Sequence, residues 1–366
     1  MPKITPIRVT PAAMRRASRR RSRPKDLLRP ARIPRMPQNN VFAGPYLERE
    51  GHLRADPARI ESALADPRSR VVPVWKSLNL VAVGPSAAAA SNGPSAAAAA
   101  NGAADDTTLL AALLGMDEIA PQRPPGLVLL GRHNGTDLFA YEVESDETPV
   151  TPEGTRFADL RTVAALMPED QAGLLGYARA MVNWQRTHRH CGRCGTPTVP
   201  AKAGHVLVCT NPICRHEQFP RLDPAIIVLV IDGDRVLLGR QASWPAGRYS
   251  TIAGFVEPGE SLEDAVAREV QEETGIRVEG IEYHSSQPWP FPSSLMLGFT
   301  ARAISHDIQL RDLELEDARW FTREDIVGGT PFLPPNVSIS FRLIEDWFDA
   351  AAAVPLRKLH VAKPWG

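Results

Sequence analysis

The spacing of apolar positions changes along the chain between a period of two and a period near 3.6, which predicts a mixture of strands and helices. The predicted strands lie at 71–83, 126–143, 225–231, 235–240, 251–256, 278–284 and 295–304. Asn134-Gly135 and Asp232-Gly233-Asp234 interrupt these runs with residues typical of hairpin turns. The pattern therefore predicts an α+β protein.

Three helices follow from the wider spacing. One covers about 169–188, where the apolar stripe is Leu174, Ala178, Met181 and Trp184, and another covers about 338–351. The third begins after Ser261, a good N-cap that resembles a capping box with Asp264. It ends at Gly275, because glycine readily adopts the left-handed conformation that terminates a helix.

Glutamates gather on the last turns of this third helix. Glu269 and Glu273 are four residues apart and Glu272 is three from Glu269, so their carboxylates converge near one face. Each like-charged pair costs roughly 0.2 to 0.5 kcal/mol, and the helix dipole adds to the cost. A divalent cation reverses both effects, and oxygen ligands select Mg²⁺ or Mn²⁺. For three glutamates alone, a solvated acidic face is the alternative.

The helix is part of a longer motif. Residues 254–276 fit G-x5-E-x7-R-E-U-x-E-E-x-G-U at every fixed position, where U is a bulky aliphatic residue. The segment therefore resembles the Nudix box, the signature of metal-dependent hydrolases of nucleoside diphosphates linked to another moiety. The resemblance implies a Nudix α/β/α sandwich on a mixed sheet, in which the box forms a loop, a helix and a second loop.

The resemblance also implies roles for the acidic residues. Glu269, Glu272 and Glu273 would be catalytic, with Glu269 and Glu273 as metal ligands and Glu272 joining them or orienting water. The carbonyl of Ala253 and the carboxylate of Glu314 would be further ligands of Mg²⁺ or Mn²⁺. If the register of the last ligand is different, Glu316 and Asp317 are the alternatives to Glu314.

Other positions of the box would be structural. These residues are Gly254, Glu260, Arg268 and Gly275. Glu260 and Arg268 would hold the loop by an ion pair, and Gly254 would let the backbone approach closely. Phe255, next to Gly254, would stack against nicotinamide, with a place in the core as the alternative.

A second string lies ten residues after the box. It reads Ser286-Gln287-Pro288-Trp289-Pro290-Phe291-Pro292-Ser293-Ser294, and it is similar to the S-Q-P-W-P-F-P-x-S array of the NADH pyrophosphatase subfamily. Prolines restrict the backbone to extended geometry, and a rigid aromatic edge suits stacking on a flat ring. The alternative is an edge strand with a core tryptophan. The residues assigned to substrate binding are Gln287, Pro288, Trp289, Pro290, Phe291, Pro292, Ser293 and Ser294, together with Ser340, which matches a family position lining the pocket.

Cysteines form a third motif. Cys191, Cys194, Cys209 and Cys214 have the spacing C-x2-C-x14-C-x4-C, which predicts a tetrahedral structural zinc site without an open position for water. Two disulfides are the alternative. The subfamily carries such a ribbon before its Nudix domain. Its substrate-contacting Glu and Tyr positions in the ribbon appear here as Gly204 and Phe219, so Phe219 keeps only the ring as a substrate contact.

Charge is distributed unevenly although the total is zero. Residues 1–40 contain 12 Lys and Arg and one Asp, which predicts a disordered basic tail. The tail could bind RNA phosphates, act as an organelle presequence, or precede a true start at Met36. The expected domains are this tail, an α+β N-terminal domain at 41–185 with a low-complexity insert at 84–104, the zinc ribbon at 186–220 and the Nudix domain at 221–352.

The resemblance implies an NAD⁺ diphosphatase that cleaves NAD(H) to nicotinamide mononucleotide and AMP. Its partners would be NAD(H) or NAD-capped RNA, from which it would remove the cap. It also implies a homodimer, which we expect in the cytoplasm, and the absence of 18 continuous apolar residues predicts no membrane span. The alternatives are a Nudix hydrolase of ADP-ribose or another nucleoside diphosphate derivative, and a non-catalytic zinc-ribbon binding protein.

Overall fold

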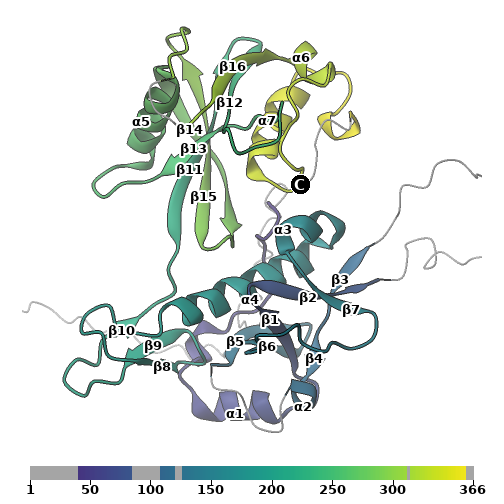
Figure 1. Cartoon of the computed structure of the whole chain (residues 1–366), viewed down its shortest axis with the longest axis vertical. Coiled ribbons are helices and arrows are strands. Elements are labelled where there is room, and N and C mark those ends of the chain that lie inside the picture. Colours follow the sequence, from purple (N-terminus) through teal and green to yellow (C-terminus); the bar gives the residue numbers. More distant parts are fainter. Residues whose placement is uncertain (1–39, 85–107, 120–125, 311–313, 360–366) are drawn as a thin grey trace, which may run out of the picture. The chain divides into compact units, whose positions relative to one another are not determined.

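The computed structural model describes residues 40–84, 108–119, 126–310 and 314–359, and Figure 1 shows the course of the chain. All of them belong to one compact unit. The predicted basic tail and low-complexity insert fall outside these residues, except for Asn40 and Gly84. In this described part, every helix is too short or too polar for a membrane span.

The first sheet forms the N-terminal domain. Its strands are β1 (Arg70–Trp75), β2 (Leu78–Val83), β3 (Leu109–Ala111), β4 (Leu114–Gly115), β5 (Val128–His133), β6 (Thr136–Glu142) and β7 (Thr155–Ala158). β1 runs parallel to β6 and antiparallel to β2 and β4. The helices around it are η1 (Gly51–Leu53), α1 (Pro57–Ala65), α2 (Met116–Ile119), α3 (Leu160–Val163), η3 (Ala164–Leu166) and α4 (Glu169–Thr187).

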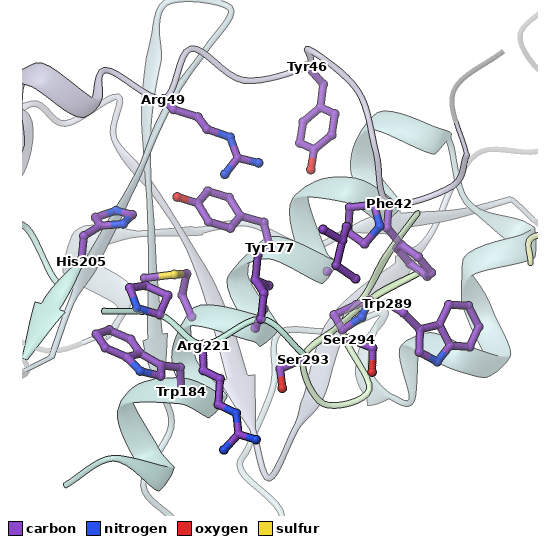
Figure 2. A pocket seen from close by; sticks show the side chains of 18 of the residues that line it. Phe42, Tyr46, Arg49, Tyr177, Trp184, His205, Arg221, Trp289, Ser293 and Ser294 are labelled. Carbon is purple, nitrogen blue, oxygen red and sulfur yellow. The ribbon is translucent and has the colours of Figure 1, made fainter. Parts of the chain in front are cut away.

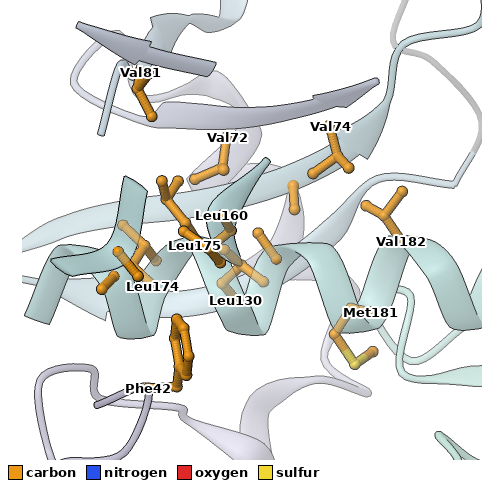
Figure 3. Packing of buried hydrophobic residues seen from close by; sticks show 14 of the residues in the cluster. Phe42, Val72, Val74, Val81, Leu130, Leu160, Leu174, Leu175, Met181 and Val182 are labelled. Atoms are coloured by element: carbon orange, nitrogen blue, oxygen red, sulfur yellow. The ribbon is translucent and has the colours of Figure 1, made fainter. Parts of the chain in front are cut away.

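Helix α4 provides the main apolar face against this sheet. The predicted stripe of Leu174, Ala178, Met181 and Trp184 is buried, as expected. Figure 3 shows Leu174 and Leu175 of α4 beneath Val72 of β1, with Phe42 on the other side of the helix. Glycine at position 176 makes this second contact possible, since a β-carbon there would lie 3.2 Å from both Phe42 and Pro290.

The zinc ribbon contains a small antiparallel sheet of β8 (Thr198–Ala201), β9 (Val206–Cys209) and β10 (Glu217–Gln218). Leu207 of β9 belongs to the same apolar cluster as α4. A backbone hydrogen bond from Leu129 of β5 to the carbonyl of Ala203 adds a polar contact. The ribbon is therefore packed on the N-terminal domain by both apolar and backbone contacts.

The second sheet is mixed and has six strands: β11 (Asp223–Asp232), β12 (Arg235–Arg240), β13 (Ile252–Phe255), β14 (Val278–Trp289), β15 (Ser294–Ala303) and β16 (Asp317–Thr322). Their order is β14-β15-β11-β12-β16, with β13 paired to β11. The helices are α5 (Leu262–Thr274), α6 (Arg323–Val327), α7 (Ile339–Asp349) and η4 (Leu356–Lys358).

Alternate side chains of β11 point to different helices. Ile226 and Val228 belong to the apolar cluster of α5, whereas Ile227 and Leu229 belong to that of α7. The sheet therefore lies between α5 and α7, which confirms the expected α/β/α sandwich. Figure 1 shows α5 and α7 on either side of these strands.

In the first sheet, β3, β4 and β7 were not predicted, and in the second sheet two strands differ from the sequence expectation. The strand predicted at 278–284 continues to Trp289, because its residues 285–289 pair with β15. Proline is tolerated there since β14 is an edge strand, where a missing N–H leaves no gap in the sheet. Strand β16 was not predicted; it pairs with β12 over all six of its residues.

The two sheets share one topology. In the first sheet, β1 forms an antiparallel hairpin with β2 and runs parallel to β6. In the second sheet, β11 likewise forms an antiparallel hairpin with β12 and runs parallel to β15. The short strand β4 pairs antiparallel with β1, as β13 does with β11. Strand β7 pairs with β2, as β16 does with β12. The connection from β13 to β14 contains the 13-residue helix α5, whereas the matching connection from β4 to β5 contains, among its described residues, only the four-residue α2. The N-terminal domain thus repeats the second sheet without its long acidic helix.

Candidate active site and zinc site

The acidic helix α5 is fixed at both ends as the sequence predicts. Ser261 and Asp264 form a reciprocal capping box, and Gly275 ends the helix with a φ of 73°. Gly254 lies directly against the carboxyl group of Glu269, so that a β-carbon at position 254 would overlap it. Glycine at the start of the box is therefore required for the Glu269 side chain to approach strand β13.

Arg268 connects the loop and the helix of the box. Its guanidinium pairs with Glu260 at 2.6 Å, as predicted, and donates to the carbonyl of Phe255 at 3.0 Å. The same group contacts Glu269 at 2.9 Å and Glu272 at 3.0 Å. The hydrogen bond from Arg268 lowers the pKa of Glu260 to about 2, so Glu260 is ionised and holds the arginine in place.

Glu269 and Glu273 are buried, with 8% and 4% of their surface exposed, whereas Glu272 is exposed. Burial raises the pKa of Glu269, Arg268 opposes this shift, and the charges of Glu272 and Glu314 add to it. Glu314 is therefore near enough to act on Glu269 across the site. The carboxylate cluster has the oxygen ligands that suit a hard divalent cation.

The two alternatives to Glu314 already have cationic or hydroxyl partners. Glu316 forms an ion pair with Arg240, while Asp317 pairs with Arg319 at 2.7 Å and accepts a hydrogen bond from Tyr249. Glu314 also has an interaction partner, so partners alone do not rank the three carboxylates, and Glu314 stays the expected ligand because its charge acts on Glu269.

The expected substrate contacts lie on the opposite face of the sheet from α5. Phe255 pairs with Ala225, which lies on the same face as Ile227 two residues later, and Ile227 belongs to the α7 cluster. Gln287 pairs with Met296, which also packs against the α7 cluster. Ser294 lies two residues before Met296, so alternation places it on the same face. Strand β13 lies between this face and the glutamates. Ala253, whose carbonyl is the expected metal ligand, belongs to β13 and pairs with Ile227.

Phe255 and Phe219 are both exposed, at 59% and 63%. The alternative core position for Phe255 is therefore excluded by the structure. A large exposed ring one residue from Gly254 is available for stacking on a flat ligand. Gly204 has a φ of 85°, and a β-carbon there would lie 2.7 Å from the carbonyl oxygen of Leu127, so the structure has no space for a side chain at this ribbon position.

Gln287 is completely buried, and its amide is bonded to backbone. Its nitrogen donates to the carbonyls of Val41 and Val337, and its oxygen accepts from the N–H of Ile339. Ser340 is also buried, and its hydroxyl bonds Ser250 and Thr251 before β13. In this structure both side chains position the elements around the candidate substrate face.

The aromatic array is divided between a strand and a turn. Pro288 and Trp289 end β14, and Pro290, Phe291, Pro292 and Ser293 connect it to Ser294 at the start of β15. The alternative interpretation as an edge strand thus applies to the first part. Phe291 is 7% exposed and packs into the core of the N-terminal domain, 5.7 Å from the ring of Phe42. Its contribution is to anchor the turn, which the string alone did not indicate.

The cysteine site has the geometry of a metal centre. The four sulfur atoms all lie within 4.8 Å of one another, including 3.4 Å between Cys194 and Cys209 and 3.9 Å between Cys191 and Cys214. A disulfide requires about 2.05 Å, so the four cysteines are free thiols here. Tetrahedral zinc with bonds of about 2.3 Å places sulfurs about 3.8 Å apart, which fits. Elsewhere in the described residues no group of His, Cys, Asp or Glu ligand atoms is as tightly gathered, the box glutamates included.

Comparisons with known proteins divide the chain in the same way. Family models match as an NADH pyrophosphatase-like rudimentary NUDIX domain at 72–184, an NADH pyrophosphatase zinc ribbon domain at 186–219, and a NUDIX domain at 221–346. The first description agrees with the repeated topology and the reduced α2.

Curated relatives extend across these domains. The NAD-capped RNA hydrolase NudC of Mycobacterium bovis (strain BCG / Pasteur 1173P2) is 40% identical over 260 residues, covering 67% of this chain and 81% of that protein. The NudC of Stutzerimonas stutzeri is 43% identical over 217 residues, covering 59% and 75%. NAD-capped RNA hydrolase NUDT12 of Macaca fascicularis is 42% identical over 196 residues, covering 50% and 42%. With the box, the array and the ribbon in one structure, the chain belongs to the NADH pyrophosphatase family of Nudix hydrolases.

Proposed function

We propose that the protein hydrolyses the pyrophosphate bond of NAD(H), giving nicotinamide mononucleotide and AMP, and that it cleaves the same bond in NAD-capped RNA. The observation that carries this proposal is the position of β13. One side of that strand holds Glu269 against Gly254, and the other presents Phe255 on the face that Gln287 and Ser294 share. A pyrophosphate and its attached flat ring would therefore be held across one strand. The names of the curated relatives support the capped-RNA substrate.

The carboxylates would hold the catalytic cation. Glu269, Glu273 and Glu314, with the carbonyl of Ala253, offer oxygen ligands that fit Mg²⁺ or Mn²⁺. When bound, such an ion polarises phosphorus and lowers the pKa of a water molecule. Arg268 would keep Glu269 and Glu272 oriented through its contacts at 2.9 and 3.0 Å. Glu272, which is exposed, would accept a proton from the attacking water.

The substrate side would supply orientation. Phe255 would stack on nicotinamide, which favours a flat ring over a sugar at this position. Gln287 and Ser340 would act by fixing the N-terminal turn of α7 and the approach to β13. The four cysteines would hold a structural zinc, since all ligand positions would be occupied by sulfur.

A substitution at Glu273 tests the function. Purified protein and the Glu273→Gln variant are incubated with NADH, NAD-capped RNA and ADP-ribose in Mg²⁺ or Mn²⁺, and the products are resolved by chromatography. We expect AMP-type cleavage of NADH and of the cap to fall by about 10² or more in the variant, because the metal loses a ligand. Glu263→Gln, at an exposed position in the first turn of the same helix, is the control and should keep full activity.

Two outcomes would contradict the proposal. Turnover of ADP-ribose alone would show that the array does not select nicotinamide. Absence of turnover with all three substrates would favour a binding protein with an inactive Nudix fold. Relative rates on NADH and capped RNA would rank the two proposed substrates.

We further propose that the protein is a homodimer. Phe219, Leu222 and Phe255 are each about 60% exposed, and burial of such large apolar side chains in an interface would favour association. Light scattering of the purified protein tests this. The four cysteines are spaced for a metal and not for disulfides, which supports a reducing compartment, and we propose the cytoplasm. The domain bounds 41–185, 186–220 and 221–352 are part of the same proposal, supported by the positions of the family matches.

A further inference from the structure

A cavity of about 370 Å³ lies away from the glutamates, where the N-terminal domain meets the segment 220–222 and the array (Figure 2). Its buried wall includes Phe42, Met181 and Trp184, which are each at most 4% exposed. Arg49 and Arg221 are at its exposed rim. The proposed catalytic chemistry uses none of these residues.

The cavity is positively charged. Three arginines line it, and its lining contains no Asp or Glu. His205 also lines it, but burial lowers the pKa of its ring to about 4, so it adds no charge near pH 7. Arg221 pairs with Asp223 at 2.5 Å, but Arg49 and Arg54 form no ion pair with a carboxylate in the described part of the chain. Arg54 also has a buried Nε atom without a hydrogen-bond partner among these residues. Arg54 donates to the carbonyl of Arg49 and to the Tyr177 hydroxyl, and Arg49 lies over the Tyr177 ring, so these contacts are with neutral groups. The positive charge of both guanidinium groups can therefore be matched by an anion, and bidentate contacts with phosphate are typical of arginine.

Flat side chains lie beside these charges. Figure 2 shows the guanidinium of Arg49 above the ring of Tyr177, and the distance to the ring centroid is 4.1 Å. Tyr46 and Trp289 also line the cavity. Trp184, which is 3% exposed, has an indole N–H that finds no acceptor in the described part of the protein. An aromatic ligand with acceptor atoms and an attached phosphate matches this combination.

The sheet register gives the distance to the metal site. Ser294 lines the cavity and pairs with Asp223 at the start of β11, while Ala253 pairs with Ile227, four residues along the same strand. At about 3.3 Å per residue, the Ser294–Asp223 pair and the Ala253–Ile227 pair are about 13 Å apart along β11. The cavity therefore lies away from the metal ligands, but it shares Pro288, Trp289, Pro290, Ser293 and Ser294 with the array assigned to substrate binding.

We propose that this cavity is a second binding site for a nucleoside phosphate, with the base against Tyr177 and Trp184 and the phosphate on Arg49 and Arg54. Its volume is at the lower end of the range of about 300 to 1,000 Å³ for small-ligand sites, which suits one nucleotide. The ligand is either a free nucleotide or a nucleotide of the RNA that follows the cap. The RNA case rests on the proposed function.

Binding of AMP to the full-length protein without added divalent cation tests the site, because binding at the glutamates would need the metal. The variant Arg49→Gln/Arg54→Gln should bind AMP at least about tenfold more weakly, since charged hydrogen bonds are lost. The control Arg156→Gln/Arg277→Gln removes the same charge from exposed positions outside the cavity and should bind as the wild type does. If the double variant is less stable in thermal unfolding, Arg49→Gln alone, at an exposed position, replaces it.

Kinetics in Mg²⁺ then distinguish the two sources. If the site takes RNA, the cavity variant should raise KM for a short NAD-capped RNA by about fivefold or more, with kcat/KM for NADH unchanged. If it takes free nucleotides only, AMP binding weakens and both KM values stay the same. Equal AMP binding and equal KM for the RNA in wild type, cavity variant and control would overturn the inference. Failure of the wild type to hydrolyse NADH or capped RNA would reject the proposed function, while the AMP measurement would still decide the cavity.

Discussion

Gly254 determines how closely the acidic helix approaches β13. The carboxyl group of Glu269 occupies the space where a β-carbon would be, so the position of one metal-ligand candidate depends on the absence of a side chain elsewhere. The pKa of Glu269 is raised by the burial that this close approach causes. A cation bound there would therefore meet a ligand that has little competing water.

Gly254→Ala should displace Glu269 and lower kcat/KM for NADH by about a hundredfold, because a shift of about 1 Å at a catalytic centre has an effect of this size. Helix α5 should keep its caps, so thermal unfolding should change little. Gly192→Ala, at a glycine with open space and an ordinary φ, is the control. Full activity of Gly254→Ala would show that the glutamate side chain can move without loss of function.

Helix spacing predicted that Glu269, Glu272 and Glu273 lie near one face, because side chains three and four positions apart are neighbours. The roles of the other box residues were implied by the resemblance to the Nudix box. The ion pair between Arg268 and Glu260 and the cap at Ser261 are confirmed. The surroundings of Gln287 could not be predicted in this way. Its acceptor Val41 is 246 residues away in the chain, so only the folded structure brings the two together.

At the scale of elements, the ribbon shows how a local motif supports a larger domain. Its cysteine spacing predicts zinc, and the sulfur geometry fits. The sequence did not show that Leu207 of β9 would be part of the core beneath α4. The predicted length of β14 was too short, because prolines in its second half argue against a strand. Only the folded structure shows that β14 lies at the sheet edge, where prolines are tolerated.

Removal of the metal should therefore weaken more than the ribbon. We expect about one zinc per chain by atomic absorption, and a chelator should lower the unfolding temperature and expose the N-terminal core as well. Hydrogen exchange at α4 and β9 measures this, with α5 as an internal reference. A protein that contains no zinc, or whose stability falls with reducing agent alone, would contradict the metal and favour disulfides.

At the scale of the whole molecule, the array joins the two related sheets. Phe291 lies in the core of the N-terminal domain, and Phe42 contacts both Phe291 and Trp289, at ring distances of 5.7 and 6.1 Å. Asn40 donates to the carbonyl of Ser286 at 2.8 Å. The turn after β14 is consequently held by the first described residues of the chain.

Phe42→Ala should destabilise both domains together, by about 3 to 5 kcal/mol, because it leaves a cavity in this shared core. Urea unfolding followed by hydrogen exchange should show α4 and the end of β14 losing protection in one step. KM for NADH should rise as the array loses its anchor. Loss of protection in α4 with β14 unaffected would show that the sheets are independent, and Val150→Ala, at a fully exposed side chain, serves as the control.

The four-residue α2 has a consequence for how this architecture can diverge. A copy of the sheet that has no acidic helix is under no demand to position metal ligands, so its loops can lengthen and its exposed strands can change without loss of chemistry. Tolerance of mutation should end at α4, where a β-carbon at Gly173 would overlap the Tyr46 ring and one at Gly176 would crowd Phe42 and Pro290. Selection should therefore act on the N-terminal domain chiefly through the contact by which it supports the second sheet.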